Sequence, residues 1–416
     1  MSQRGEKIQK EKQMAYHYRK KLEARKKKVR RIKIILAADG ILMAVLVLIL
    51  IGMGIRQWIR EDGSAAASQN QESSRVEQAA GEGETDAGAE ESAGSGEDTE
   101  TSEQAKAGQE NSAVTITVSA AGDCTLGTDE NFDYESGFTG IYDSVGDPAY
   151  FFREVQPIFS QDDLTIVNME GTLTEAESRA EKEFAFKAPP SYVEILTQGS
   201  VEAANLANNH SRDYGEQSYT DTINALDDAG ITSFGYERTA LMEIKGVKVG
   251  LVGIYELAEN LGCKEQMTAN VESLKEAGAQ IIIVSFHWGV ERETAPNEIQ
   301  IELAHAAIDS GADLVLGHHP HVISGIEEYN GKNIVYSLGN FCFGGNSAPS
   351  DMDSMIFQQT FTVENGQLKE DNVTNVIPCK VSSAYLEGYN NYQPVPVEGE
   401  AKDAILQRIQ EYSQYL

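Results

Sequence analysis

Three of the chain's seven histidines lie between residues 317 and 321, in the sequence Gly-His-His-Pro-His. They follow 312–316, a short apolar run typical of a buried strand. Alternate residues of an extended segment point the same way, so His319 and His321 are expected to face one point in space. Neutral imidazoles that converge on one point are typical ligands of a transition metal. The segment therefore predicts a metal site at the end of a strand.

Other polar residues follow predicted strands in the same way. Apolar or β-branched runs at 114–120, 164–167, 203–207 and 280–286 alternate with helical patterns at 150–159, 190–197, 216–229, 267–277 and 297–310. This alternation predicts an α/β fold, in which sites lie at the carboxyl ends of strands. The residues that fall there are Asp123, Glu170, Asn209, His210, His287, His319 and His321.

This set of residues is suited to metal-assisted hydrolysis. Carboxylates bridge divalent ions, histidine supplies softer terminal ligands, and an asparagine carbonyl is a neutral oxygen ligand. Two ions about 3.5–4 Å apart activate water and stabilise an in-line displacement. His210, next to Asn209, is placed to give a proton or a hydrogen bond to a leaving oxygen. The sequence contains neither a Gly-x-Ser-x-Gly elbow nor a Walker-type loop, which argues against a serine hydrolase and a P-loop nucleotide site.

Charge is distributed unevenly along the 416 residues, whose formal net charge is −31. The first 33 residues hold 14 Lys+Arg and 3 Asp+Glu, so the rest of the chain carries −42. Such an acidic body has nothing to neutralise phosphates, and nucleic acid is therefore not expected as a partner.

The basic head, 1–33, precedes an apolar segment at 34–58, in which residues 40–55 carry no charge. About 20 apolar residues are enough to cross a bilayer. The basic cluster in front predicts that the N-terminus lies in the cytoplasm and the main domain outside it. We therefore expect a signal anchor in a single-pass cell-membrane protein. A cleaved signal peptide is the alternative, because residues 65–67 are Ala-Ala-Ala.

The segment that follows is predicted to be a disordered acidic linker over 59–112. From residue 62 to 112 there is no aromatic residue, and Val76 is the only branched aliphatic one. Such a segment buries too little apolar surface to offset the entropy of ordering it. The predicted globular domain then occupies 113–380, and a C-terminal extension over 381–416 is expected to pack on it.

The chain has four cysteines, Cys124, Cys263, Cys342 and Cys379, and all of them follow the linker. No Cys-x-x-Cys pair occurs, which argues against a zinc ribbon. Four cysteines allow three full pairings, and the sequence does not choose among them.

The ordered set of motifs resembles the CapA family of poly-γ-glutamate capsule biosynthesis proteins, which is related to calcineurin-like metallophosphoesterases. The resemblance covers roughly residues 114–380, and it is the order of the motifs that makes it specific. These motifs are Gly122-Asp123, Asn168-Met169-Glu170-Gly171, Asn208-Asn209-His210, His287-Trp288-Gly289, the His-rich segment 317–321 and Tyr336-Ser337-Leu338-Gly339-Asn340-Phe341.

The resemblance implies a four-layer αββα sandwich with one or two divalent ions, Mn, Zn or Fe, at one edge. It also implies two partners, the membrane subunits of a capsule synthase and an anionic polymer. Glu170 would bridge the ions and His210 would be the proton donor. By the family's motifs, the metal ligands would be Asp123, Glu170, Asn209, His287, His319 and His321, while His318, Asn168 and Asn208 would contact these ligands instead of an ion.

The sequence also departs from the broader phosphoesterase pattern. That pattern opens with Asp-x-His, whereas Asp123 is followed by Cys124 and Thr125, and Glu170 stands where the pattern has Gly-Asp. One ion would therefore lack a nitrogen ligand. We expect a membrane-anchored capsule biosynthesis protein with a metal-dependent hydrolase-like site. Two alternatives stay open: a non-catalytic scaffold that binds polymer or synthase subunits, and a metal-dependent phosphodiesterase or nucleotidase.

Overall fold

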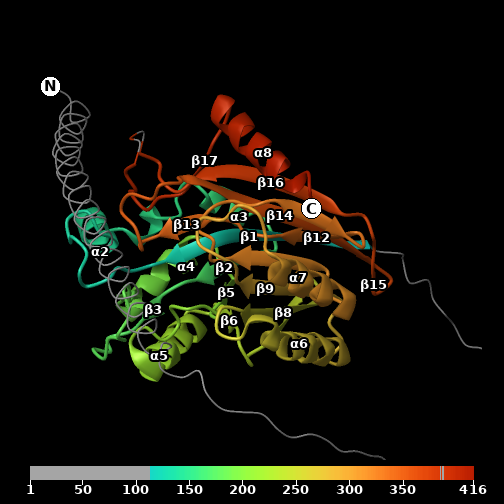
Figure 1. The fold of residues 1–416 in the computed structure, drawn as a ribbon. Coiled ribbons are helices and arrows are strands. Elements are labelled where there is room, and N and C mark those ends of the chain that lie inside the picture. Colours follow the sequence, from blue (N-terminus) through green and yellow to red (C-terminus); the bar gives the residue numbers. More distant parts are fainter. Residues whose placement is uncertain (1–112, 385, 387) are drawn as a thin grey trace, which may run out of the picture. The chain divides into compact units, whose positions relative to one another are not determined.

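Two β-sheets form the centre of the fold (Figure 1). The computed structural model describes residues 113–384, 386 and 388–416, which belong to one compact unit. The α/β class predicted from the sequence is confirmed. The larger sheet has nine strands in the order β17-β16-β14-β1-β2-β5-β6, with β13 also on β1 and β15 also on β14. These are β1 (Ala113–Thr125), β2 (Leu164–Met169), β5 (Ala203–Asn205), β6 (Thr232–Phe234), β13 (Asn340–Phe343), β14 (Asp353–Glu364), β15 (Gln367–Leu368), β16 (Val373–Lys380) and β17 (Val395–Pro396).

The smaller sheet has six strands in the order β11-β12-β10-β9-β8-β7. Its strands β8, β9, β10 and β12 run parallel, as do β1, β2, β5 and β6 of the larger sheet. The bounds are β7 (Ala240–Ile244), β8 (Val247–Tyr255), β9 (Ile281–His287), β10 (Leu314–His318), β11 (Ile326–Tyr329) and β12 (Lys332–Val335). A separate pair is formed by β3 (Thr172–Leu173) and β4 (Lys187–Ala188).

The longer helices begin and end close to where sequence signals predict. Asn297 and Gln300 form a capping box at the start of α7, and Gly311 ends that helix at φ 117°. The predicted helix at 150–159 is wrong in part, because a 3₁₀ turn and one short α-helix share that stretch, and α2 was not predicted. The helices are α2 (Phe138–Val145), α3 (Gln156–Phe159), α4 (Glu194–Gln198), α5 (Gly215–Asp228), α6 (Lys264–Glu276), α7 (Glu298–Ser310) and α8 (Glu400–Ser413), with 3₁₀ turns η1 (Pro148–Tyr150), η2 (Pro190–Val193) and η3 (Asn260–Cys263).

Strand β9 is apolar on both faces because it serves two cores. Ile281 and Ile283 face a core that they share with residues of β1, β2 and β14 from the other sheet. Ile282, Val284 and Phe286 face a second core with the buried side of α6 and α7. Parallel strands covered on both faces have this composition. The two sheets therefore pack face to face, with helices on their outer sides, and a third core joins the larger sheet to α4 and α5.

The C-terminal helix α8 packs onto this body through Ile405 and Ile409, which are buried in the core between the sheets. Figure 1 shows α8 lying along β16. Arg408 of the same helix pairs with Asp351 and Asp353 near the start of β14. An apolar stripe and an ion pair on one helix thus hold the end of the chain in place.

All four cysteines are buried free thiols. Burial raises the pKa of Cys124 and of Cys263 to about 12, so both stay protonated at neutral pH. None of the three possible full pairings is formed.

Among residues 113–384, 386 and 388–416, no helix is long and apolar enough to cross a bilayer. The predicted basic segment 1–33, transmembrane helix 34–58 and linker 59–112 lie outside the described residues.

Candidate metal centre

Polar residues at the carboxyl ends of strands from both sheets meet in one place. Asp123 is near the end of β1, and Glu170 follows β2 directly. His287 is the last residue of β9, and the loop with His319 follows β10. Register sets the alignment, because Asp123 pairs with Asn168 across β1 and β2, and His287 pairs with His318 across β9 and β10. The predicted strand-end convergence is thus present in the fold.

The convergent side chains form two groups that share one carboxylate. Glu170, His287 and His319 make one group, and Asp123, Glu170 and His321 make the other. Within each group the ligand atoms lie within 4.8 Å of one another. A carboxylate common to two such groups is the arrangement in which one residue bridges two ions.

His319 and His321 converge for a reason that differs from the predicted one. Strand β10 ends at His318, so neither residue lies on an extended segment. Both have left-handed backbone, with φ 95° at His319 and 58° at His321. The predicted strand alternation is therefore wrong as the cause, although both residues lie at one cluster, in two groups that share Glu170. Non-glycine residues in this region are strained, and such strain concentrates at functional sites.

Three histidines, His321, His287 and His210, lie around one oxygen of Glu170. Its Oε1 lies 3.7 Å from Nε2 of His321, 3.8 Å from Nε2 of His287 and 3.9 Å from Nε2 of His210. These separations are too long for hydrogen bonds. Both carboxylate oxygens of Glu170 are buried and lack a hydrogen-bond partner among the described residues, as does Nδ1 of His319.

These orphaned atoms fit a bound divalent cation. An unpaired buried carboxylate is costly, and proteins normally pair such a group or use it to coordinate a metal. Imidazole nitrogens and carboxylate oxygens together suit Zn, Mn or Fe. The ligands would be Asp123, Glu170, His287, His319 and His321, and a pair of ions held there would supply water activation and charge neutralisation.

Asparagine side chains hold these ligands in position. Asn168 Nδ2 donates to Asp123 Oδ1 at 2.8 Å and lies 3.2 Å from His287 Nδ1. Asn205 donates in turn to Asn168 Oδ1 at 3.0 Å. Asn209 Oδ1 accepts from His287 Nε2 at 2.9 Å, so this predicted ligand lies at the site. These contacts set the orientation of the His287 ring, and an ion bound at Nε2 would replace the hydrogen bond to Asn209.

Two further predicted residues lie behind the ligands. Asn208 donates to the carbonyl of Met169 and accepts from the backbone N–H of His210, which ties the loop after β5 to β2. His318 is buried and its Nδ1 lies 3.5 Å from Asp123 Oδ1, so it contacts a ligand and belongs to neither ligand group.

Charges at the site are strongly coupled. Burial raises the pKa of Glu170 to about 8 against the attraction of His321, and the neighbouring Asp123 adds to the rise. Burial alone would lower the pKa of His321, but attraction by Glu170 and Asp123 raises it to about 9. Burial and the charge on His321 lower the pKa of His319 to about 4, which leaves that ring neutral and able to bind metal. Near neutral pH the cluster of Asp123, Glu170 and His321 therefore retains protons, and a bound cation would supply positive charge in their place.

His210 is held by a carboxylate and a lysine that the sequence did not reveal. Its Nδ1 lies 2.7 Å from Asp213 Oδ2, and a carboxylate can only accept, so Nδ1 carries the proton. Lys182 donates to Asp213 Oδ1 and to the carbonyl of Asn209, both at 2.7 Å. The Phe186 ring packs 4.4 Å from the imidazole. The other nitrogen, Nε2, faces Glu170, and burial lowers the pKa of His210, so Nε2 is poised to exchange a proton.

A close backbone approach brings β1 and the loop before β13 together at the site. A Cβ on Gly122 would lie 2.0 Å from the carbonyl oxygen of Gly339, so only glycine fits there. The neighbouring N–H of Asp123 donates to that same carbonyl at 3.0 Å. Asn340 then reaches His321, with Oδ1 3.0 Å from Nδ1.

Sequence reasoning missed Asp213, Lys182 and Asn340. Asp213 had a usable signal, because it lies three residues after His210 in the turn before α5, within reach of the imidazole. Asn340 lay inside a quoted motif, without an assigned role. Lys182 had no signal, since it reaches the site through the loop between β3 and β4.

A family model described as bacterial capsule synthesis protein PGA_cap matches residues 117–345, which include all of the predicted ligands. The chain belongs to this family. Over 213 residues it is 34% identical to the PGA biosynthesis protein CapA of Bacillus subtilis, which covers 46% of this chain and 56% of that protein. Over 220 residues it is 31% identical to the capsule biosynthesis protein CapA of Bacillus anthracis, which covers 47% of this chain and 54% of that protein. The chain thus matches just over half the length of these relatives, and the CapA resemblance seen in its motifs is confirmed.

Proposed function

We propose that this PGA_cap family member is a metal-dependent hydrolase that acts in the synthesis or anchoring of an anionic surface polymer of the poly-γ-glutamate type. The fold is proposed to be the four-layer sandwich of metallophosphoesterases, with two metal ions bound at the edge where both sheets meet. One observation carries the proposal, namely two ligand groups that share Glu170, whose two buried oxygens have no hydrogen-bond partner among the described residues. The polymer is suggested by the relatives' names, since two of them are capsule or PGA biosynthesis proteins.

The geometry supports a division of roles among the residues. Asp123, Glu170, His287, His319 and His321 would hold divalent ions, which polarise the scissile group and activate water when bound. His210 Nε2 lies beside this cluster, and Asp213 keeps the proton of the ring on Nδ1. The protonated His210 ring would give its Nε2 proton to the leaving atom. Asp213 would stabilise the positive charge of the ring before this transfer.

We also propose that the domain is held outside the cytoplasm by the apolar segment 34–58, with the N-terminus inside. The segment's length and the preceding basic cluster support this topology. A membrane location would bring the domain close to the membrane subunits of a capsule synthase and to the emerging polymer, the two partners that we propose.

The first experiment measures metal in the purified full-length chain by mass spectrometry. A double variant, His319→Ala with His321→Ala, removes one ligand from each group. His305→Ala is the matched control, because this histidine stacks on Tyr329 at 3.8 Å, away from the cluster. We expect one to two ions per chain in the wild type and the control, and loss in the double variant. A wild type that stays metal-free after reconstitution would refute the hydrolase proposal.

A second experiment separates a hydrolase from a scaffold. His210→Ala leaves every member of the two ligand groups in place. A hydrolase carrying this change should retain metal, lose turnover of γ-linked glutamate oligomers, and fail to restore polymer display in a deletion strain. Full restoration of display would instead identify a scaffold, and turnover of phosphodiesters alone would identify a phosphodiesterase.

A further inference from the structure

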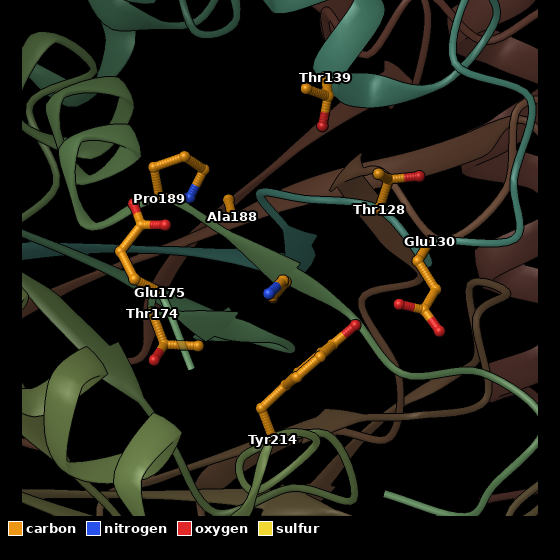
Figure 2. Close-up of a pocket in the computed structure, with 9 residues that line it drawn as sticks. Thr128, Glu130, Thr139, Thr174, Glu175, Ala188, Pro189 and Tyr214 are labelled. Atoms are coloured by element: carbon orange, nitrogen blue, oxygen red, sulfur yellow. The ribbon is translucent and has the colours of Figure 1, made fainter. Parts of the chain in front are cut away.

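A cavity of about 200 Å³ lies between the loop after β1, the β3–β4 pair and the start of α5. Figure 2 shows its lining, with Glu130 and Glu175 on opposite sides and the Tyr214 side chain reaching into the space between them. None of these residues belongs to the metal-ligand groups.

Tyr214 brings an unused hydroxyl into this cavity. The residue is 1% exposed, and its hydroxyl has no hydrogen-bond partner among the described residues. A buried hydroxyl without a partner is costly, and few native groups are left in that state. A ligand that accepts a hydrogen bond here would satisfy it.

Lys187 adds a positive charge to the same cavity, over the face of the Tyr214 ring. Its Nζ lies 4.5 Å from the centroid of the Tyr214 ring and donates to the carbonyl of Ala176 at 2.8 Å. An ammonium has three donors, so two remain for a ligand. A cation and a hydroxyl that face one space are suited to a carboxylate.

Two carboxylates complete the lining at the rim. Glu130 is 60% exposed at its side chain, with Arg179 Nε 3.6 Å away, and Glu175 is exposed. The cavity therefore offers two hydrogen-bond donors inside, the Lys187 ammonium and the Tyr214 hydroxyl, and negatively charged carboxylates at its rim. A ligand with a carboxylate and an ammonium on one carbon matches both.

We propose that this cavity binds an α-amino acid head group, with its carboxylate on Lys187 and Tyr214 and its ammonium toward Glu175. If the proposed function holds, on which this identification rests, the head group is the amino end of a γ-linked glutamate chain. Internal units of such a chain keep the carboxylate, but their nitrogen is an uncharged amide. A free amino acid carries the same chemistry and is the other source of the ligand.

Two residues that line the cavity are next in the chain to residues that contact His210 at the metal centre. Lys187 follows Phe186, whose ring packs on His210, and Tyr214 follows Asp213, which binds the same imidazole. Asp213 also accepts a hydrogen bond from the N–H of Phe186. An amino end held in the cavity is therefore bound by the two segments that position His210.

The test is calorimetric titration of the purified full-length chain in chelator, so that metal binding does not enter the result. The three ligands are a γ-linked glutamate trimer, its N-acetylated form, and glutamate. Tyr214→Phe removes only the unpartnered hydroxyl and should weaken the trimer about tenfold, as loss of a hydrogen bond to a charged group does. Lys187→Met should weaken it at least as much, and Lys264→Met, at an exposed lysine, is the control.

The ammonium is tested by the acetylated trimer and by Glu175→Gln. The wild type should bind the free trimer about tenfold more tightly than the acetylated one, and Glu175→Gln should reduce this preference. Tighter binding of the trimer than of glutamate assigns the chain end, and equal binding of both assigns a free amino acid. Equal affinity for the free and acetylated trimers, or unchanged affinity in Tyr214→Phe and Lys187→Met, would overturn the proposal. Head-group binding by a chain that never takes up metal would refute the proposed hydrolase alone.

Discussion

Replacing Glu170 by glutamine should make the metal-free protein more stable while it destroys the metal site. Both oxygens of Glu170 are buried without a hydrogen-bond partner among the described residues. Glutamine keeps the shape of the side chain and removes its charge. The change therefore separates the cost of a buried carboxylate from its use as a ligand.

The size of the effect follows from the pKa of Glu170. Burial raises it from an ordinary value of 4.5 to about 8 in the folded, metal-free protein. The folded state therefore binds the proton more tightly than the unfolded state, and stability falls as the pH rises from about 4.5 to about 8. At pH 7 the loss is about 3 kcal/mol, at 1.36 kcal/mol for each pH unit above 4.5. The glutamine variant should lack this loss.

The assay is urea unfolding of the full chain, followed by tryptophan fluorescence, in chelator and in Mn²⁺. In chelator at pH 7 we expect Glu170→Gln to exceed the wild type by at most about 3 kcal/mol, because the variant also loses the attraction between Glu170 and His321, and at pH 4 the two should agree. With Mn²⁺ at a hundred times its Kd the wild type should gain about 2.7 kcal/mol, and the variant almost nothing.

The matched control is Glu202→Gln, at a carboxylate that accepts a hydrogen bond from the N–H of Thr165 at 2.8 Å and belongs to neither ligand group. This variant should retain the full gain from Mn²⁺. The reasoning about Glu170 is refuted if Glu170→Gln is less stable than the wild type in chelator at pH 7, or if it gains as much from Mn²⁺.

Two further predictions concern Asp213 and Glu202. Asp213→Asn should lower turnover about 10²-fold or more with metal content unchanged, because an amide lacks the charge and the second acceptor oxygen with which Asp213 keeps the proton of His210 on Nδ1. A parallel loss of metal by mass spectrometry would contradict this role. Burial raises the pKa of Glu202 to about 7 from 4.5, so the folded state favours its protonated form and wild-type stability should fall as the pH rises across that window. In thermal melts from pH 4 to pH 8, Glu202→Gln should show a smaller fall than the wild type, and parallel curves would exclude Glu202 as a source of the pH dependence.

Much of the fold is determined by local patterns in the sequence. The continuous apolar run of β9 predicts a strand covered on both faces, and its alternate residues do face two cores. Asn297 and Gly311 mark the two ends of α7 through capping that involves only neighbouring residues. Helix α2 and the interrupted turns around 148–159 were mispredicted, because short helices there depend on packing against the larger sheet more than on their own pattern.

The sequence by itself also identified which residues would gather at the site. Polar residues that end parallel strands must lie on one edge of a sheet, which is why Asp123, Glu170 and His287 were recognised. The motif order was sufficient to recognise the family that the comparison confirmed.

Only the tertiary structure decided how the ligands divide between two groups. His319 and His321 are two residues apart, yet left-handed backbone directs them to different groups, and no periodic pattern encodes that geometry. Glu170 is common to both groups because it follows β2 of the larger sheet and lies against His287 and His321, which come from the end of β9 and the loop after β10 in the smaller sheet. Asp213 and Lys182 act on His210 from the turn before α5 and from the loop between β3 and β4. Sequence fixes the chemical identity of each group, but contacts between residues far apart in the chain exist only once the sheets have packed.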